Sequence, residues 1–210
     1  MCLSRSWTKN GCISEEQVRS LLEWVREHAG ANRSVYPFMR IVAEQALRPT
    51  EARALRVSDV ALAEGDPGKL TARHKGMARE IPLQPQFVEF LREWISAAGL
   101  QEDDLLLPGT RGGRLSASVW QRIWQQAQEA VLPRDELYSW RLGEPISILR
   151  ESRLVKWLDM GISPITVAEW GGRNPELAGA ALPALLPHGE GRNRLGHLAE
   201  VMALPDSPRS

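Results

Sequence analysis

The amino-acid sequence predicts a mainly helical fold with a small antiparallel β-sheet, which places the chain in the α+β class. Apolar residues recur every three or four positions through most of the chain, as they do on the buried face of a helix. Two short segments in the first half have the composition of strands and flank a turn. The 210 residues are 43% apolar and 25% charged, which is ordinary for a globular domain with one core.

The first predicted helices follow from local signals. Ser14 and Gln17 have the spacing of a capping box, in which each side chain accepts a hydrogen bond from the other residue's backbone amide, so a helix is expected over residues 15–28. A second helix is predicted over residues 35–47, where apolar residues again recur at helical spacing. Pro49 suits the first turn of a short third helix.

The middle of the chain contains the predicted sheet. Residues 69–73 and 79–83 are expected to be strands, and residues 74–78 the turn between them. Apolar residues at helical spacing then predict helices over residues 85–98 and 116–131.

The second half is expected to begin with an irregular segment over residues 133–145. Apolar residues between 148 and 158 outline the next helix, which Gly161 ends. Ser163 has the position of an N-cap for a short helix that runs to Trp170.

Composition excludes several classes of protein. No apolar stretch approaches about 20 residues, the length of a membrane-spanning helix, and the N-terminus has no apolar core of the kind found in signal peptides. Cys2 and Cys12 form neither a disulfide framework nor a metal-binding spacing, and the four histidines are scattered. We therefore expect a cytoplasmic protein with no membrane contact, no bound metal and no cofactor.

The charge balance bears on nucleic-acid binding. The chain has 26 basic and 26 acidic residues, so its net charge is zero. Nucleic-acid binders usually carry a positive excess, because their cations displace counterions from phosphates. A nucleic-acid partner therefore requires that the charges are unevenly distributed over the surface.

Four segments stand in order along the chain: residues 46–60 (ALRPTEARALRVSDV), 73–83 (RHKGMAREIPL), 147–150 (SILR) and 166–176 (TVAEWGGRNPE). In this order, they resemble the catalytic domain of tyrosine recombinases, the phage integrase family. The resemblance covers most of the chain, from about residue 13 to 187, and we expect this range to form one domain between tails at 1–12 and 188–210. The separate N-terminal domain with which such integrases clamp DNA is expected to be missing.

The resemblance implies a known chemistry. In the family, a tyrosine hydroxyl attacks a DNA phosphate and forms a 3′-phosphotyrosyl link with a free 5′-hydroxyl. Two arginines hold the non-bridging phosphate oxygens and neutralise the charge of the transition state. A lysine protonates the leaving oxygen, and histidines assist proton transfer.

Three cations of this chain match family positions. Arg48 and Arg150 match the two arginines, and Lys75 matches the lysine, although His74 or Arg73 is an alternative for that position. Each match has a structural interpretation beside it. Arg48 is also explained as a capping residue, Arg150 as the ion-pair partner of a neighbouring glutamate, and Lys75 as a solvated turn residue.

Other positions depart from the family pattern. Ser147 stands where the family has histidine and is expected to be a helix N-cap. Glu151 stands where a second histidine often follows the arginine, and Arg173 replaces a later histidine or tryptophan, which adds a third cation near the anion site. Counting from Gly172 puts Leu182 at the position of the nucleophilic tyrosine.

The chain has two tyrosines, and neither stands at the nucleophile position. Tyr36 lies on the second predicted helix, where an aromatic side chain is expected in the core. Tyr138 lies upstream of the Ser147 segment, and its reach toward the site is left open. Since a leucine cannot attack phosphorus, we expect that the chain alone does not cleave DNA.

Three hypotheses follow. The first, which we favour, is a recombinase-derived DNA-binding protein that is unable to cleave, with duplex DNA and an active recombinase as partners. The second is an enzyme or small-molecule binder that uses the former cationic active site for a different anion. The third is a decaying fragment of a mobile element, which the intact apolar periodicity disfavours.

Overall fold

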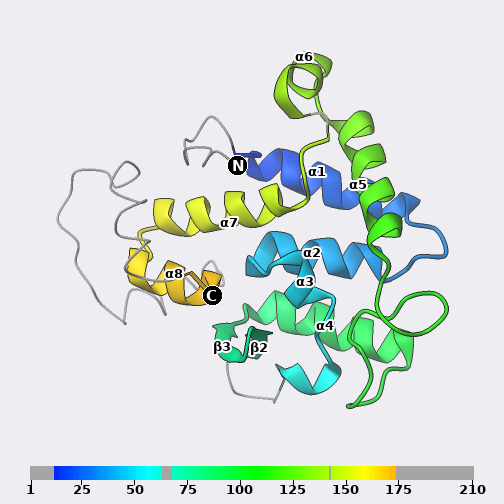
Figure 1. The fold of residues 1–210 in the computed structure, drawn as a ribbon, viewed down its shortest axis with the longest axis vertical. Helices are drawn as coiled ribbons and strands as arrows, with labels where there is room; N and C mark the ends of the chain where they lie inside the picture. Colours follow the sequence, from blue (N-terminus) through cyan, green and yellow to red (C-terminus); the bar gives the residue numbers. More distant parts are fainter. Residues whose placement is uncertain (1–11, 63–67, 142, 174–210) are drawn as a thin grey trace, which may run out of the picture.

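The computed structural model of the protein describes residues 12–62, 68–141 and 143–173. Figure 1 shows these residues as a helical body with a hairpin at one side. The helices are α1 (Glu15–His28), α2 (Val35–Gln45), α3 (Pro49–Ala52), α4 (Pro85–Ala98), α5 (Ala117–Val131), α6 (Arg134–Glu136), α7 (Ser147–Asp159) and α8 (Pro164–Gly171), with a 3-10 turn η2 (Val57–Asp59) and a π-helical turn η3 (Leu137–Arg141). The strands are β1 (Val60–Ala61), β2 (Lys69–His74) and β3 (Met77–Pro82).

Helix α1 begins as its sequence predicts. The Gln17 amide donates to Ser14 Oγ at 3.2 Å, and the Ser14 amide donates to Gln17 Oε1 at 3.0 Å, so the capping box is formed. Glu15 and Glu16 in the first turn and His28 in the last turn complement the helix dipole.

The sheet is larger than the sequence predicts, and its hairpin is tighter. β2 pairs antiparallel with β3 from Lys69 opposite Pro82 to His74 opposite Met77. Lys75 and Gly76 alone form the turn, both with positive φ (50° and 80°), which is typical of a two-residue hairpin. β1 pairs with the other edge of β2, so the strand order is β1-β2-β3.

Helix α2 is the centre of the core. In Figure 1 it runs between α7 and α4, and it is covered on several sides. Within one stretch of five residues of α2, four side chains have 0% exposure, namely Phe38, Met39, Ile41 and Val42. Burial over most of its surface explains why this helix carries few polar residues, of which Arg40 and Glu44 are only half-buried. Within the described ranges, no helix has the length and apolar character to cross a membrane.

The prediction of an irregular segment over residues 133–145 was wrong. This segment contains α6 and η3, which a buried arginine stabilises. The Arg141 side chain is 2% exposed and forms ion pairs with Glu136 at 2.5 Å and Glu144 at 2.9 Å. Its Nη2 also donates to the Cys12 carbonyl oxygen at 2.8 Å. The residues that form such an ion-pair network do not recur at a regular apolar spacing. The sequence pattern therefore did not predict the helical turns that the network stabilises.

The prediction of Ser147 as an N-cap was also wrong. Ser147 is the first residue of α7, and Ile146 occupies the cap position without a side-chain hydrogen bond. The cap of α8 was predicted correctly, since the Thr166 amide donates to Ser163 Oγ at 3.2 Å.

Candidate functional site

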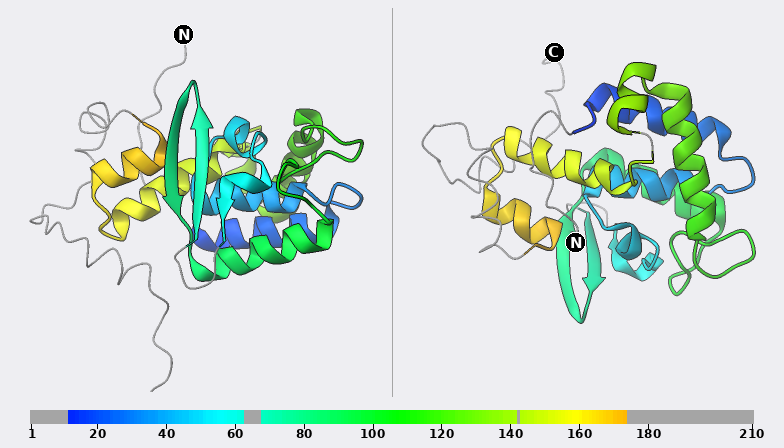
Figure 2. Two further views of the ribbon diagram at one scale, coloured as in Figure 1. Left: turned by 90° about the horizontal axis from the view of Figure 1, so that it is seen from below. Right: turned by 45° about the horizontal axis from the view of Figure 1, so that its top comes forward.

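The family-matched arginines come from separate segments that meet at the C-terminal end of α8. Arg48 immediately precedes α3, Arg150 lies in the first turn of α7, and Arg173 follows α8. Figure 2 shows α8 beside both α7 and the β2–β3 hairpin, and α8 packs against α7 and β3. The fold therefore brings residues that are more than 100 positions apart, such as Arg48 and Arg150, to one helix end.

Three consecutive backbone carbonyl oxygens at this helix end accept hydrogen bonds from three arginines. A helix C-terminus carries unsatisfied carbonyl groups and a partial negative charge, so it favours cations. The pairs are Arg79 Nε with Trp170 O at 2.8 Å, Arg150 Nη2 with Gly171 O at 2.7 Å, and Arg48 Nη2 with Gly172 O at 2.6 Å.

The buried carboxylate of Glu51 accepts hydrogen bonds from two of these arginines, Arg48 and Arg79. Its side chain is 1% exposed. Arg79 donates to it from both Nη atoms, each at 2.8 Å, and Arg48 donates from its amide and from Nη1, again at 2.8 Å. Burial alone would raise the pKa of Glu51, but the hydrogen bonds and charges of Arg79 and Arg48 outweigh it and lower the pKa to about 2. Glu51 is therefore ionised at neutral pH.

Glu151 has the same role for the other two arginines. Arg150 Nη1 donates to Glu151 Oε1 at 2.8 Å, and Arg173 Nη2 donates to Glu151 Oε2 at 2.8 Å. The Arg150 side chain is 6% exposed. Burial lowers the pKa of Arg150 to about 10, with Glu151 opposing the shift and Arg173 and Arg48 adding to it. Its buried Nε has no hydrogen-bond partner among the described residues.

The Gly171–Gly172 turn permits this close approach. Gly172 has a φ of +59°, and a Cβ there would lie 2.7 Å from Arg79 Nη1 and 3.0 Å from Arg48 Nη1. A Cβ on Gly171 would lie 3.0 Å from Leu154 Cδ2. Gly172 therefore allows the left-handed turn in which two guanidinium groups approach the backbone, and Gly171 leaves room for Leu154.

The arrangement fits an anion. Four guanidinium groups and two carboxylates leave two positive charges in this cluster. Arg173 is 36% exposed, Glu151 30% and Arg48 29%, so two of the arginines and one of the carboxylates face solvent. Planar guanidinium groups bind phosphate or carboxylate oxygens in pairs. No group of three or more His, Cys, Asp or Glu in the described ranges has an arrangement for a metal ion.

Lys75 does not join the arginines. It lies in the exposed turn of the hairpin and forms no hydrogen bond or ion pair with the described residues. Figure 2 shows the hairpin extending from the body, with this turn at its free end. Ser147 is half-buried near the site, and Leu182 lies outside the described residues.

The two tyrosines lie elsewhere. Tyr36 on α2 is half-buried and packs edge-to-face on Phe90, with 5.8 Å between the ring centroids. Tyr138 is 68% exposed. It lies in η3, which packs on α5 and is separated from α8 in both Figure 1 and Figure 2.

Two residues of the cluster were missed at the level of sequence. Arg79 shares a face of β3 with the fully buried Ile81, because side chains two apart on a strand point the same way. Glu51 follows Arg48 by three residues, and its carboxylate accepts a hydrogen bond from the Arg48 amide, as the third residue of a capping box does. Both spacings are visible in the sequence, but neither residue is one of the cations that match positions of the family.

Comparisons with known proteins bear on the family and the fold of this chain. The protein-family model described as "Phage integrase family" matches residues 12–138, which are 127 of the 210 residues. A comparison with curated proteins finds no match.

Several solved structures share the fold. The XerH site-specific recombinase bound to its difH substrate has a TM-score of 0.64 at 19% identity, over 80% of this chain and 49% of that one. The XerA recombinase has a TM-score of 0.64 at 16% identity, over 95% of this chain and 64% of that one. The catalytic domain of bacteriophage HP1 integrase has a TM-score of 0.58 at 17% identity, over 84% of this chain and 88% of that domain.

This chain spans about half the length of the XerH chain that it matches. The predicted α+β fold is confirmed as that of a tyrosine recombinase catalytic domain. By its sequence match, the chain belongs to the phage integrase family.

Proposed function

We propose that this chain is a recombinase-derived protein that binds duplex DNA through the arginine cluster, acts in DNA integration or recombination, and does not cleave DNA by itself. One observation carries the proposal: four arginines from distant segments converge on the end of α8, and two of them face solvent.

The cluster suits a phosphodiester backbone. Arg48 and Arg173 present guanidinium groups at the surface, and Glu51 and Glu151 hold them in place through ion pairs. A cation held in advance loses little entropy when it binds a phosphate. Two of the structural neighbours, XerH and the Tn1549 transposon integrase, are recombinases that were solved in complex with DNA.

Three features oppose cleavage by this chain alone. Counting along the sequence from Gly172 puts an aliphatic residue, Leu182, at the nucleophile position that the family resemblance implies. Tyr36 is packed against the ring of the half-buried Phe90, and Tyr138 lies on an element away from α8. Ser147 replaces a histidine and has an ordinary hydroxyl, which is a poor general base at neutral pH. Cleavage would then depend on an active recombinase as partner.

DNA binding is tested by fluorescence anisotropy on a labelled duplex across a salt series. We expect sub-micromolar affinity at low salt and a linear fall of log affinity with log salt concentration. Arg173→Gln should weaken binding several-fold and reduce the salt slope by about 1. Arg26→Gln is the matched control, because it removes an exposed arginine from α1, and it should change binding little. Affinity weaker than micromolar, or a flat salt series, would refute the proposal.

Cleavage is tested separately with a nicked suicide duplex, which traps any covalent intermediate. We expect no protein–DNA adduct from the purified chain. An adduct would contradict the proposed loss of cleavage, and Tyr138→Phe and Tyr36→Phe would then identify the nucleophile.

A second function has some support. Glu51 and Glu151 neutralise half of the cluster, and Arg150 is almost completely buried, which suits a small anion as well as a DNA strand. Under this alternative, the protein is an enzyme or small-molecule binder that uses the same arginine cluster. Inorganic pyrophosphate should then raise the melting temperature, while duplex DNA should not.

A further inference from the structure

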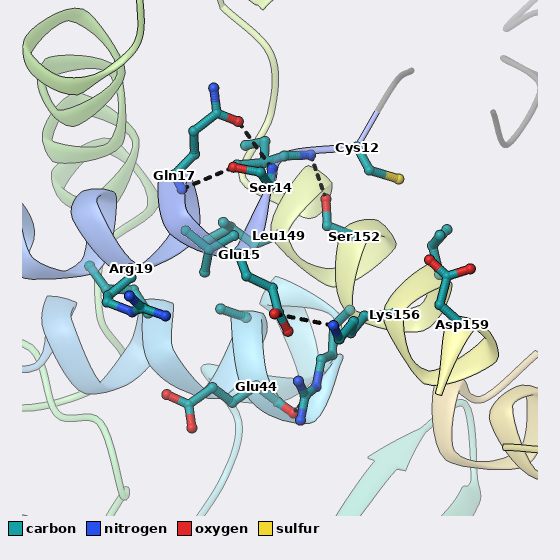
Figure 3. Close-up of a pocket in the computed structure, with 16 residues that line it drawn as sticks. Cys12, Ser14, Glu15, Gln17, Arg19, Glu44, Leu149, Ser152, Lys156 and Asp159 are labelled. Atoms are coloured by element: carbon teal, nitrogen blue, oxygen red, sulfur yellow. Dashed lines mark hydrogen bonds and ion pairs between the residues drawn. The ribbon is translucent and has the colours of Figure 1, made fainter. Parts of the chain in front are cut away.

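A cavity of about 590 Å³ lies between α1, α2 and α7. Its volume is within the range of roughly 300–1,000 Å³ that is typical of small-molecule sites. It is separate from the arginine cluster, because α7 contributes Arg150 to the cluster and a different set of residues to the cavity, Ser152, Arg153 and Lys156 among them. Figure 3 shows its lining side chains.

Part of the lining is apolar. Side chains from all three helices contribute, so an apolar ligand would lose water contact on several sides. These residues are Val18, Leu22, Ala43, Leu149 and Val155.

The charged part of the lining has carboxylates that are already paired. Glu15 forms an ion pair with Lys156 at 3.1 Å, which Figure 3 shows across the cavity between α1 and α7. Glu44 forms an ion pair with Arg40 at 2.5 Å. Asp159 lies in the last turn of α7, toward the Cys12 side of the cavity in Figure 3.

Two arginines of the lining have no carboxylate partner within the described part of the chain. Arg19 on α1 forms no ion pair there, and Figure 3 shows its side chain extending over the cavity. Arg153 on α7 donates from Nε to the Glu44 carbonyl oxygen at 3.1 Å and lies 5.5 Å from the centroid of the Trp157 ring. Its Nη atoms form no hydrogen bond with described residues.

The environment of Arg153 favours an incoming anion. Burial lowers the pKa of Arg153, and the charges of Glu44 and Glu15 oppose the shift only in part. A desolvated cation that lacks a carboxylate partner is stabilised when an anion binds beside it.

We propose that this cavity binds a small organic anion with an apolar body. The acidic group lies between Arg19 and Arg153, and the apolar body lies against Leu149, Val18 and Leu22. The site goes beyond DNA binding, because none of these residues belongs to the arginine cluster at α8.

Octanoate is a suitable probe, with octanol and octylammonium as matched ligands that differ in charge. In ¹⁵N-labelled full-length protein, octanoate should cause saturable shifts in the amides of Val18, Arg19, Ser152 and Arg153. Its affinity should exceed that of octanol by about fivefold or more, as expected when one exposed and one desolvated arginine contact a carboxylate. Octylammonium should bind weakest.

Variants assign the charge contact. Arg19→Gln and Arg153→Gln should each reduce octanoate affinity severalfold and leave octanol affinity unchanged, and Arg26→Gln on the same helix should change neither. If Arg153→Gln unfolds the protein, Arg19→Gln decides alone, because Arg19 is exposed and has no packing role. Equal binding of octanoate and octanol, no saturable shifts at the lining amides, or unchanged octanoate affinity in Arg19→Gln would overturn the proposal.

Discussion

Replacement of Glu51 by glutamine removes the charge that holds Arg48 and Arg79 together. Glu51 accepts four hydrogen bonds of 2.8 Å from these two arginines and is 1% exposed. The glutamine keeps the size of the side chain but leaves two partly buried guanidinium groups without a counter-charge. The perturbation therefore tests electrostatics with little change in packing.

The size of the effect follows from the pKa. The pKa of Glu51 falls from an ordinary 4.5 to about 2, and one pKa unit corresponds to about 1.4 kcal/mol, so the ionised carboxylate contributes about 3 kcal/mol to the free energy of unfolding. Loss of one partner from a buried ion pair costs about 3–5 kcal/mol in other proteins, which agrees with the contribution calculated for Glu51.

The pH dependence has a definite sign. Because the folded-state pKa lies below the unfolded-state value, the stabilisation is complete above about pH 5 and is lost as the pH falls from 4.5 toward 2. Glu51→Gln should therefore destabilise by about 3 kcal/mol at pH 7, and the difference from wild type should shrink as the pH falls below 4.5.

Urea unfolding of wild type and variant, followed by tryptophan fluorescence from pH 7 to pH 3, measures both quantities. Glu23→Gln is the control, because Glu23 is 58% exposed and its ion pair with Arg26 should contribute no more than about 1 kcal/mol. A loss below about 1 kcal/mol at pH 7, or a loss that does not change with pH, would refute the reasoning.

Three further predictions concern other parts of the structure. Gly172→Ala should weaken duplex binding in the anisotropy assay and lower the melting temperature, since its Cβ would lie 2.7 Å from Arg79 Nη1 at a φ of +59°; an unchanged affinity would show that the turn does not position the arginines. Arg141→Met should destabilise by about 3 kcal/mol in urea unfolding, because it leaves Glu136 and Glu144 without their buried cation; a neutral effect would mean that packing, not charge, holds η3. Ser163→Ala should cost about 1 kcal/mol through loss of the α8 cap, and equal stability of variant and wild type would contradict the cap assignment.

The parts of the fold that local sequence predicts are those with local causes. The capping box of Ser14 and Gln17, the cap at Ser163 and the alternation of β2 and β3 each involve residues a few positions apart. Apolar spacing also predicts the long helices, because burial of one face decides their stability. These elements agree with the structure within a few residues.

The parts that were missed depend on contacts across the chain. Arg141 binds the Cys12 carbonyl oxygen 129 positions away, and this contact helps to order a segment that has no apolar period. Arg79 reaches Glu51 across 28 positions and the Trp170 carbonyl oxygen across 91. A single sequence contains no periodic signal for such pairs, so it predicts Arg79 only as a residue of a strand.

The same long-range contacts explain why the hairpin contributes an arginine to the site instead of Lys75. The two-residue turn puts Lys75 at the free end of the hairpin, whereas Arg79 is positioned by β3 beside α8. Three of the five N–H groups of Arg79 donate to Glu51 or Trp170, and its side chain is only 15% exposed, so this residue mainly positions its neighbours. Arg48 and Arg173, which are more exposed, are the groups that an anion reaches first. The cluster therefore separates into a buried support and an exposed contact surface, and docking of α8 onto β3 is what joins them.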